Sequence, residues 1–74
     1  MVNKKQQRVI IGSIMAATGK TVEMVARERG YTKVAFYDVI KGKTKTPFLK
    51  NLIASITGKP ITELWPNEKE HHNA

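Results

Sequence analysis

Apolar residues recur along the chain at helical spacing, and short breaker motifs separate the segments that carry them. Asn3 with Gln6 three residues on is a capping-box signal, which predicts a first helix that stops at Gly19. Thr21 is a suitable N-cap for a second, very short helix that ends at Gly30. Because such residues satisfy or terminate backbone hydrogen bonds, they predict where the helices begin and end.

Two more helices follow from the same signals. Thr32 can cap a helix over residues 33–41, with Gly42 as its stop. Thr46-Pro47 starts a fourth helix, because proline in the first turn loses no hydrogen bond there. This fourth helix is expected to run until Gly58.

A last turn of helix opens at Pro60 and ends at Pro66, and no segment alternates at period two as a strand would. The expected fold class is therefore all-α: a compact bundle of four to five short helices over residues 1–66, with a polar, flexible tail at residues 67–74. Phe36, Val39 and Ile40 are expected to point inward, and the other apolar positions that these helices carry are Ile10, Ile11, Ile14, Met15, Val22, Val25, Ala26, Phe48, Leu49, Leu52, Ile53, Ile56, Ile61, Leu64 and Trp65.

The composition limits the kind of protein. Seventy-four residues allow one domain at most, since two hydrophobic cores would not fit. The absence of cysteine excludes disulfides and thiolate-ligated metal sites, so helix packing must supply the stability. With 41% apolar and 26% charged residues, the sequence is too hydrophobic to be disordered.

The charge is strongly positive and unevenly distributed. Thirteen lysines and arginines against six acidic residues give a net charge of +7. Residues 1–50 hold eleven basic and three acidic side chains (+8), whereas residues 51–74 hold two and three (−1). The excess belongs to particular elements, which favours a polyanionic partner such as nucleic acid or an acidic membrane surface over a generally basic soluble protein.

The basic start at Lys4, Lys5 and Arg8, followed by the apolar run 9–17, imitates a signal peptide. Cleavage after this run would remove the first helix, and the run is far shorter than the roughly 20 apolar residues of a membrane span. The basic residues are also not gathered on one long amphipathic helix. We therefore expect an uncleaved, cytoplasmic protein with no membrane partner.

The most informative stretch, residues 22–42, is predicted to form two short helices joined by a tight turn. Gly30 permits the left-handed backbone conformation that a sharp corner needs. Ala26 is small enough for the second helix to cross close by, and Phe36 can fill the angle between the two. These offsets match a helix-turn-helix, and a chance corner in a helical bundle is the alternative.

The outer face of the predicted helix 33–41 combines valine and tyrosine with lysines, which is unusual for a solvated surface. Against DNA, lysine can donate to guanine, aspartate can accept from cytosine, valine can contact a thymine methyl group, and tyrosine can reach a base or a phosphate. The candidate base contacts are therefore Lys33, Val34, Tyr37 and Asp38.

A run of lysines follows, and such a run suits the phosphates that flank a recognition site. Taken alone, the run can equally be a solvated loop. Together with the two threonine caps, the candidate phosphate contacts are Thr21, Thr32, Lys41, Lys43, Lys45 and Lys50.

The predicted corner and the segment after it contain a recurring set of residues: Ala26, Gly30, Phe36, Val39 and Lys41-Gly42-Lys43. In this set the chain resembles the lambda-repressor-like phage regulators. Further motifs are Gly30-Tyr31, Leu52-Ile53-Ala54, Thr57-Gly58-Lys59-Pro60 and Leu64-Trp65-Pro66. With these, the chain resembles the phage Mu Ner-type regulators and their bacterial Ner-like relatives over roughly residues 8–66. The resemblance implies a compact, all-helical DNA-binding regulator of phage or prophage transcription.

One position departs from the family pattern. Many lambda-repressor-like proteins have a glutamine at the start of the second helix, where it helps to fix the recognition helix and contacts DNA. Here that position is Val22, so the polar contact is missing. The exposed stripe on the third helix is also this chain's own, so the resemblance does not supply an operator sequence.

Other candidate sites are supported by fewer features of the sequence. His71 and His72 beside Glu68 and Glu70 are metal-ligating types, but adjacent histidines in a flexible tail lack the hydrogen-bond partners that orient metal ligands. The sequence contains no Gly-rich phosphate loop and no nucleophile with a base and an orienting partner. We expect no enzyme activity, no cofactor and no metal. Trp65 is expected to fill the core against the first and fourth helices, with a partner-binding anchor as the alternative.

The leading hypothesis is a sequence-specific transcriptional regulator, a repressor, that binds double-stranded DNA as a homodimer. The alternative is a protein-interaction module, antirepressor or antitoxin-like, that keeps a helix-turn-helix fold without reading DNA.

Overall fold

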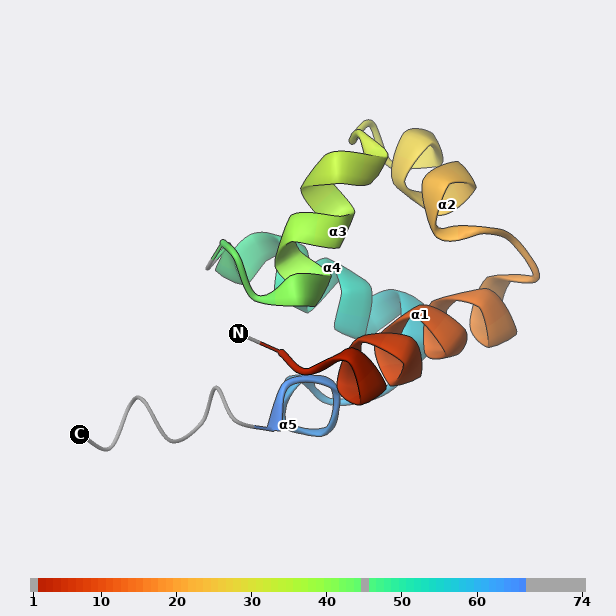
Figure 1. Ribbon diagram of the computed structural model, residues 1–74. Helices are drawn as coiled ribbons and strands as arrows, with labels where there is room; N and C mark the ends of the chain where they lie inside the picture. Colours follow the sequence, from red (N-terminus) through yellow and green to blue (C-terminus); the bar gives the residue numbers. More distant parts are fainter. Residues whose placement is uncertain (1, 45, 67–74) are drawn as a thin grey trace.

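The computed structural model describes residues 2–44 and 46–66, and these residues form helices and no strand (Figure 1). The all-α fold class predicted from the sequence is confirmed for this part of the chain. The expected tail at residues 67–74, which includes both histidines, lies outside the described residues. The helices are α1 (Lys4–Thr18), α2 (Val22–Glu28), α3 (Lys33–Lys41), α4 (Pro47–Thr57) and α5 (Ile61–Leu64).

The predicted caps begin the first three helices. Side-chain oxygens of Asn3, Thr21 and Thr32 each accept a hydrogen bond from the backbone N–H three residues on, at 2.8, 3.2 and 3.2 Å. A cap of this kind contributes about 1 kcal/mol. Glycines with positive φ follow the first four helices, as the sequence predicted: Gly19, Gly30, Gly42 and Gly58.

Gln6 differs from the prediction. Its side chain does not return to Asn3 to complete a capping box, and instead its Nε2 group donates to the backbone oxygens of Glu63 and Leu64, at 3.2 and 2.8 Å. Those oxygens lie in the last turn of α5, where helical carbonyls lack partners within the helix. A contact between distant segments thus replaces the local one and joins α1 to α5.

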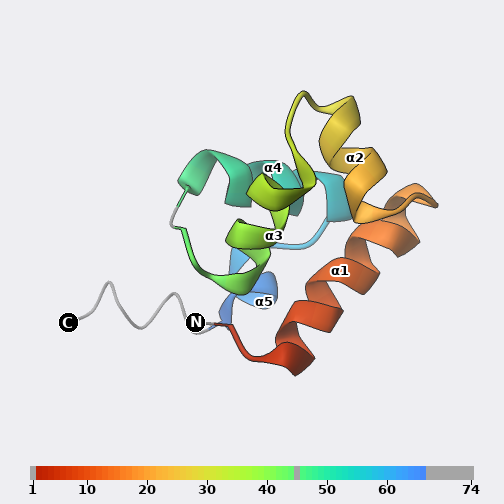
Figure 2. The ribbon, with the colours of Figure 1, turned by 45° about the horizontal axis from the view of Figure 1, so that its top comes forward.

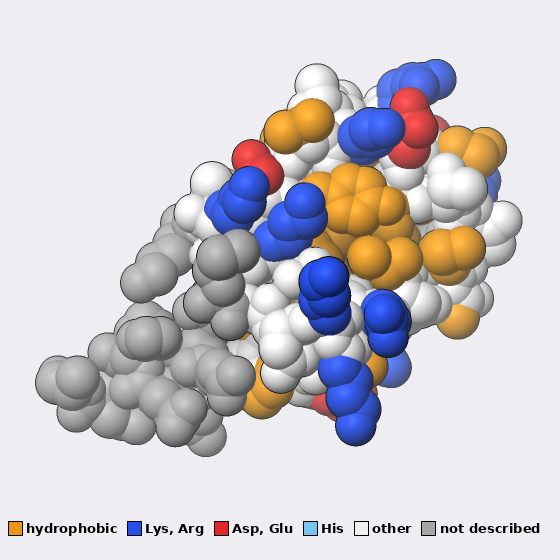
Figure 3. Space-filling model, in the orientation of Figure 1, with side chains coloured by type: hydrophobic (Ala, Val, Ile, Leu, Met, Phe, Trp, Pro, Cys, Tyr) orange, Lys and Arg blue, Asp and Glu red, His pale blue; other side chains and the backbone are white. Residues whose placement is uncertain are grey.

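All five helices contribute to one hydrophobic core. α1 packs mainly on α4, and α2 packs mainly on α3. In Figure 2, α3 lies near the centre of the molecule, between α2 and α5. Figure 3 shows hydrophobic side chains filling the space between α1, α2 and α3 on one face, with Lys and Arg side chains around them. The buried apolar residues are Ile10, Ile14, Val22, Val25, Ala26, Phe36, Val39, Ile40, Leu49, Ile53, Leu64 and Trp65.

Two residues of the apolar helical stripes lie at the surface. Met15 is 45% exposed and Phe48 is 65% exposed. Met15 lies in the last turn of α1 and Phe48 in the first turn of α4, so both apolar stripes extend beyond the faces that neighbouring helices cover. Helical spacing of apolar residues therefore does not by itself predict burial.

Two segments distant in sequence form hydrogen bonds with the backbone of α3. The backbone N–H of Val2 donates to the carbonyl oxygen of Lys41 at 3.0 Å, and the side-chain amide of Gln7 donates to the Val2 carbonyl at 2.7 Å. The indole N–H of Trp65 likewise donates to the carbonyl oxygen of Val39, at 3.2 Å. Both ends of the described chain are therefore attached to the second half of α3.

Candidate nucleic-acid interface

A tight turn joins α2 to α3. The backbone N–H groups of Gly30 and Tyr31 donate to the carbonyl oxygens of Arg27 and Ala26, at 3.1 and 2.9 Å, and these bonds close the end of α2. Gly30 has a φ of 84°, the left-handed conformation that reverses the chain at low steric cost. Ala26 and Phe36 are fully buried in the core that the two helices share, and the Tyr31 and Phe36 rings lie 6.0 Å apart. The turn and this packing fix α3 against α2.

The four predicted base contacts differ in exposure along α3. Lys33 and Val34 are exposed side by side at the start of the helix, and Val34 is 60% exposed. Tyr37 and Asp38 are half-buried, and Tyr37 packs against the edge of the core. The structure thus brings Lys33 and Val34 together on the surface, whereas it partly covers the other two.

The predicted phosphate contacts lie at both ends of α3 and at the start of α2. Thr21 and Thr32 are exposed, and because each hydroxyl oxygen accepts the capping bond, its O–H remains able to donate. Lys43 is exposed just after α3, and Lys41 is half-buried in its last turn. Lys45 lies outside the described residues.

Lys50 does not belong to the exposed basic run, and that prediction was wrong. Lys50 is only 8% exposed, and its Nζ atom lies 5.6 Å from the centroid of the Trp65 ring. The long aliphatic stem of a lysine can cover apolar surface, and an aromatic face attracts its ammonium group. The side chain therefore covers the core of α4 and Trp65, and we exclude it from the candidate interface.

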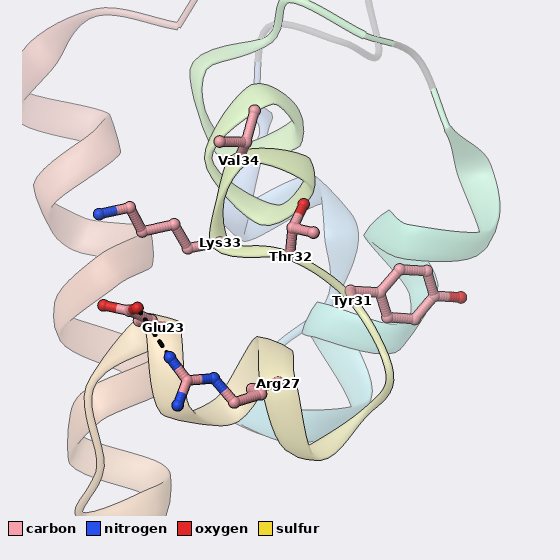
Figure 4. Close-up of a pocket in the computed structure, with 6 residues that line it drawn as sticks. All are labelled: Glu23, Arg27, Tyr31, Thr32, Lys33 and Val34. Atoms are coloured by element: carbon pink, nitrogen blue, oxygen red, sulfur yellow. Dashed lines mark hydrogen bonds and ion pairs between the residues drawn. The ribbon is translucent and has the colours of Figure 1, made fainter.

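The structure adds a feature that the sequence analysis missed, a shallow hollow of about 310 Å³ between α2 and the start of α3 (Figure 4). In this hollow, Arg27 donates from Nη2 to Oε2 of Glu23 at 3.0 Å. The i, i+4 spacing of these two residues predicts an ion pair on α2, but only the fold places it beside α3. The hollow is lined by Glu23, Arg27, Tyr31, Thr32, Lys33 and Val34.

Metal sites and membrane spans are two other features that the described residues could hold. No group of three or more His, Cys, Asp or Glu side chains that could hold a metal ion occurs there. No single helix there is long and apolar enough to cross a membrane, although α1 and α2 pass that test together as a pair bent by 64°.

In comparisons with protein-family models, curated proteins and solved structures, nothing matched this chain.

Proposed function

We propose that this chain is a sequence-specific regulator of transcription, a repressor of the phage or prophage type, that binds double-stranded DNA. In this proposal α2 and α3 act as a helix-turn-helix, and α3 enters the major groove. The observation that carries the proposal is the pairing of exposed Lys33 and Val34 at the start of a short helix that is packed firmly against α2. A major groove about 12 Å wide admits such a helix.

The two residues supply complementary chemistry. The ammonium group of Lys33 can donate to the O6 and N7 acceptors of guanine, and the methyl groups of Val34 can contact a thymine methyl group. Both side chains lie in the first turn of α3, and in helix-turn-helix complexes the N-terminal residues of the recognition helix contact the base edges. Tyr37 and Asp38 lie one turn further on, and their partial burial gives them a smaller part in recognition.

Two lysines and two threonines at the helix ends would contact the DNA backbone. Lys41 and Lys43 lie at the far end of α3, and the threonine caps Thr21 and Thr32 lie at the starts of α2 and α3. Contacts to phosphates from both ends would position α3 without reading sequence. The net charge of +7 would speed the approach to DNA.

One recognition helix covers only a few base pairs, so we propose that two copies bind a two-fold-related operator. The region after residue 50 is the less basic part of the chain, and it includes most of α4 and all of α5. Contact through this region would bring two copies together with the least charge repulsion.

A second candidate function, a protein-interaction module, is favoured by a different observation. Phe48 is 65% exposed in the first turn of α4, and a large exposed ring is typical of a protein contact. Under this alternative, α2 and α3 keep their packing but bind no DNA.

Selection from a pool of randomised duplexes, followed by a gel-shift assay with competitor DNA, tests the proposal. We expect a defined consensus and strongly salt-dependent binding to it. Failure to retain any duplex at low salt, with the protein folded by circular dichroism, would contradict the proposal and favour the protein-interaction module.

A further inference from the structure

We infer that the hollow between α2 and α3 binds one phosphate group of the DNA backbone. Arg27 is its cationic ligand, and Glu23 is a positioning residue that holds Arg27. The inference rests on the proposed function, because it requires duplex DNA as the ligand. It extends the DNA-contacting surface from α3 onto α2.

Residues of two helices line the hollow. Arg27 comes from the last turn of α2, and Thr32 and Lys33 come from the start of α3. Figure 4 shows Lys33 and the Glu23–Arg27 pair lying beside one another, whereas the Tyr31 hydroxyl points away from them. The ligand is therefore the Arg27 guanidinium, and Tyr31 is not one.

The charges fit a single phosphodiester. Glu23 contributes one negative charge, and Arg27 and Lys33 contribute one positive charge each, so the lining of the hollow carries +1. A backbone phosphate carries −1. Apolar Val34 lies at the edge of the same hollow, next to the groove-facing start of α3.

The pairing of Arg27 with Glu23 leaves the guanidinium able to bind an anion. A guanidinium has five N–H donors in a planar fork, and the ion pair uses the Nη2 nitrogen. The Arg27 side chain is 76% exposed, so without a partner it would sample many rotamers. Holding it beside α3 lowers the entropy lost when the phosphate binds.

A phosphate fits this position better than a base does. In helix-turn-helix complexes, the helix before the recognition helix crosses the DNA backbone. Arg27 lies on that preceding helix, outside the helix that would enter the groove. The contact therefore adds affinity for every sequence alike.

Arg27→Ala tests the phosphate contact against a matched control, Arg8→Ala, which removes the same charge from the half of α1 that lies beside α5 (Figure 1). Fluorescence anisotropy with the selected duplex and with a random duplex measures both variants. We expect Arg27→Ala to weaken both complexes about tenfold or more, because charge-assisted hydrogen bonds are lost. The slope of log affinity against log salt should fall by roughly 0.9. Arg8→Ala should change the affinity much less.

Single neutral methylphosphonate substitutions along the selected duplex then locate the phosphate. We expect one position per half-site at which neutralisation weakens the wild-type complex but not the Arg27→Ala complex. If wild type binds duplex DNA and no position shows this coupling, the inferred site is wrong while the proposed function stands. If wild type binds no duplex, the proposed function itself fails.

Glu23→Ala distinguishes a role of Glu23 in positioning Arg27 from simple repulsion between the Glu23 carboxylate and DNA. If Glu23 acts through Arg27, its removal should weaken wild-type binding about threefold, the scale of an exposed ion pair, and should not weaken binding of the Arg27→Ala variant. Tighter binding in both backgrounds would show that Glu23 only repels DNA, and its positioning role would be wrong.

Discussion

The indole N–H of Trp65 donates a 3.2 Å hydrogen bond to the backbone oxygen of Val39, in the last turn of α3. Trp65 is 1% exposed and packs beneath Lys50, so its burial opposes the reading of this residue as a partner-binding anchor. α5 and the tryptophan after it therefore support the helix that we propose to read DNA.

Trp65→Ala should destabilise the fold by about 3–5 kcal/mol, because aromatic-to-alanine changes in a core leave a cavity. Trp65→Phe keeps most of the ring and loses the indole donor, and since the Val39 oxygen also accepts from Gly42, the extra cost of the lost bond should be about 1 kcal/mol. Thermal and urea melts measure both changes, and exposed Phe48→Ala is the matched control, expected within about 0.5 kcal/mol of wild type. A Trp65→Ala protein that melts like wild type but loses DNA or a partner would reverse the assignment.

Gly30 and Gly12 give a pair of substitutions with opposite expected signs. A Cβ added at either glycine would meet nothing within 4 Å, so only the backbone conformation differs. Gly30 has a φ of 84°, and Gly30→Ala should cost about 1–2 kcal/mol through backbone strain. Gly12 lies inside α1, where Gly12→Ala should stabilise by roughly 0.5–1 kcal/mol. Urea melts check both, and equal signs would contradict the left-handed turn at Gly30.

Much of the fold follows from local signals in the sequence. Thr32 and Gly42 predict the bounds of α3 as the structure has them, because a side-chain cap and a left-handed glycine act on the adjacent backbone alone. Gln6 shows the limit of such reasoning. Its sequence position predicts a local bond, but a carbonyl pair at the end of α5 becomes its partner only after the chain has folded.

Side-chain exposure is less predictable, because it depends on neighbours from distant segments. Phe48 belongs to the apolar stripe of α4, but it lies in the first turn of that helix and is 65% exposed. Lys50, by contrast, is a charged residue that is buried. The ring of Trp65, fifteen positions later in the sequence, provides an apolar surface for its aliphatic stem. At the candidate site, the sequence places Lys33 and Val34 on the exposed surface correctly, but the hollow that joins Arg27 to them depends on how α2 packs on α3.

The salt dependence of DNA binding should depend on the lysine after α3. Lys43→Ala is expected to weaken binding to all duplexes about equally and to reduce the salt slope by roughly 0.9, the value for one neutralised phosphate. Lys20→Ala is the control, because it removes the same charge from the α1–α2 connection, which lies on the opposite side of the molecule from the α3–α4 connection (Figure 1). An unchanged slope in the Lys43→Ala variant would remove this loop from the interface.

Sequence preference should depend on the first turn of α3. Lys33→Ala and Val34→Ala are each expected to relax or change the selected consensus, since a good base contact contributes about 1–3 kcal/mol of discrimination. Tyr37→Ala and Asp38→Ala should have smaller effects, because both side chains are half-buried. Val9→Ala on α1 makes the same chemical change as Val34→Ala at another exposed valine and should leave the consensus intact. Identical consensus sequences for wild type and all four α3 variants would exclude this face as the reader.

Assembly should depend on DNA. We expect free protein to be a monomer or weak dimer, because the charge of +7 makes separate copies repel one another, and we expect two copies on a full operator. Sedimentation of free protein and of its complexes with full and half operators measures this. Tight, specific one-to-one binding to a single half-site would contradict the dimer.

The attachment of α3 to both Val2 and Trp65 has a consequence for the order in which the protein matures. α2 and α3 leave the ribosome before the Trp65 indole can reach the Val39 oxygen. At synthesis rates of about 5–20 residues per second, roughly one to five seconds separate Lys41 from Trp65. During that interval the indole contact cannot form, whereas both groups of the Val2–Lys41 contact have already been synthesised. We therefore expect a newly made chain to acquire its DNA-binding shape only after α5 has been synthesised.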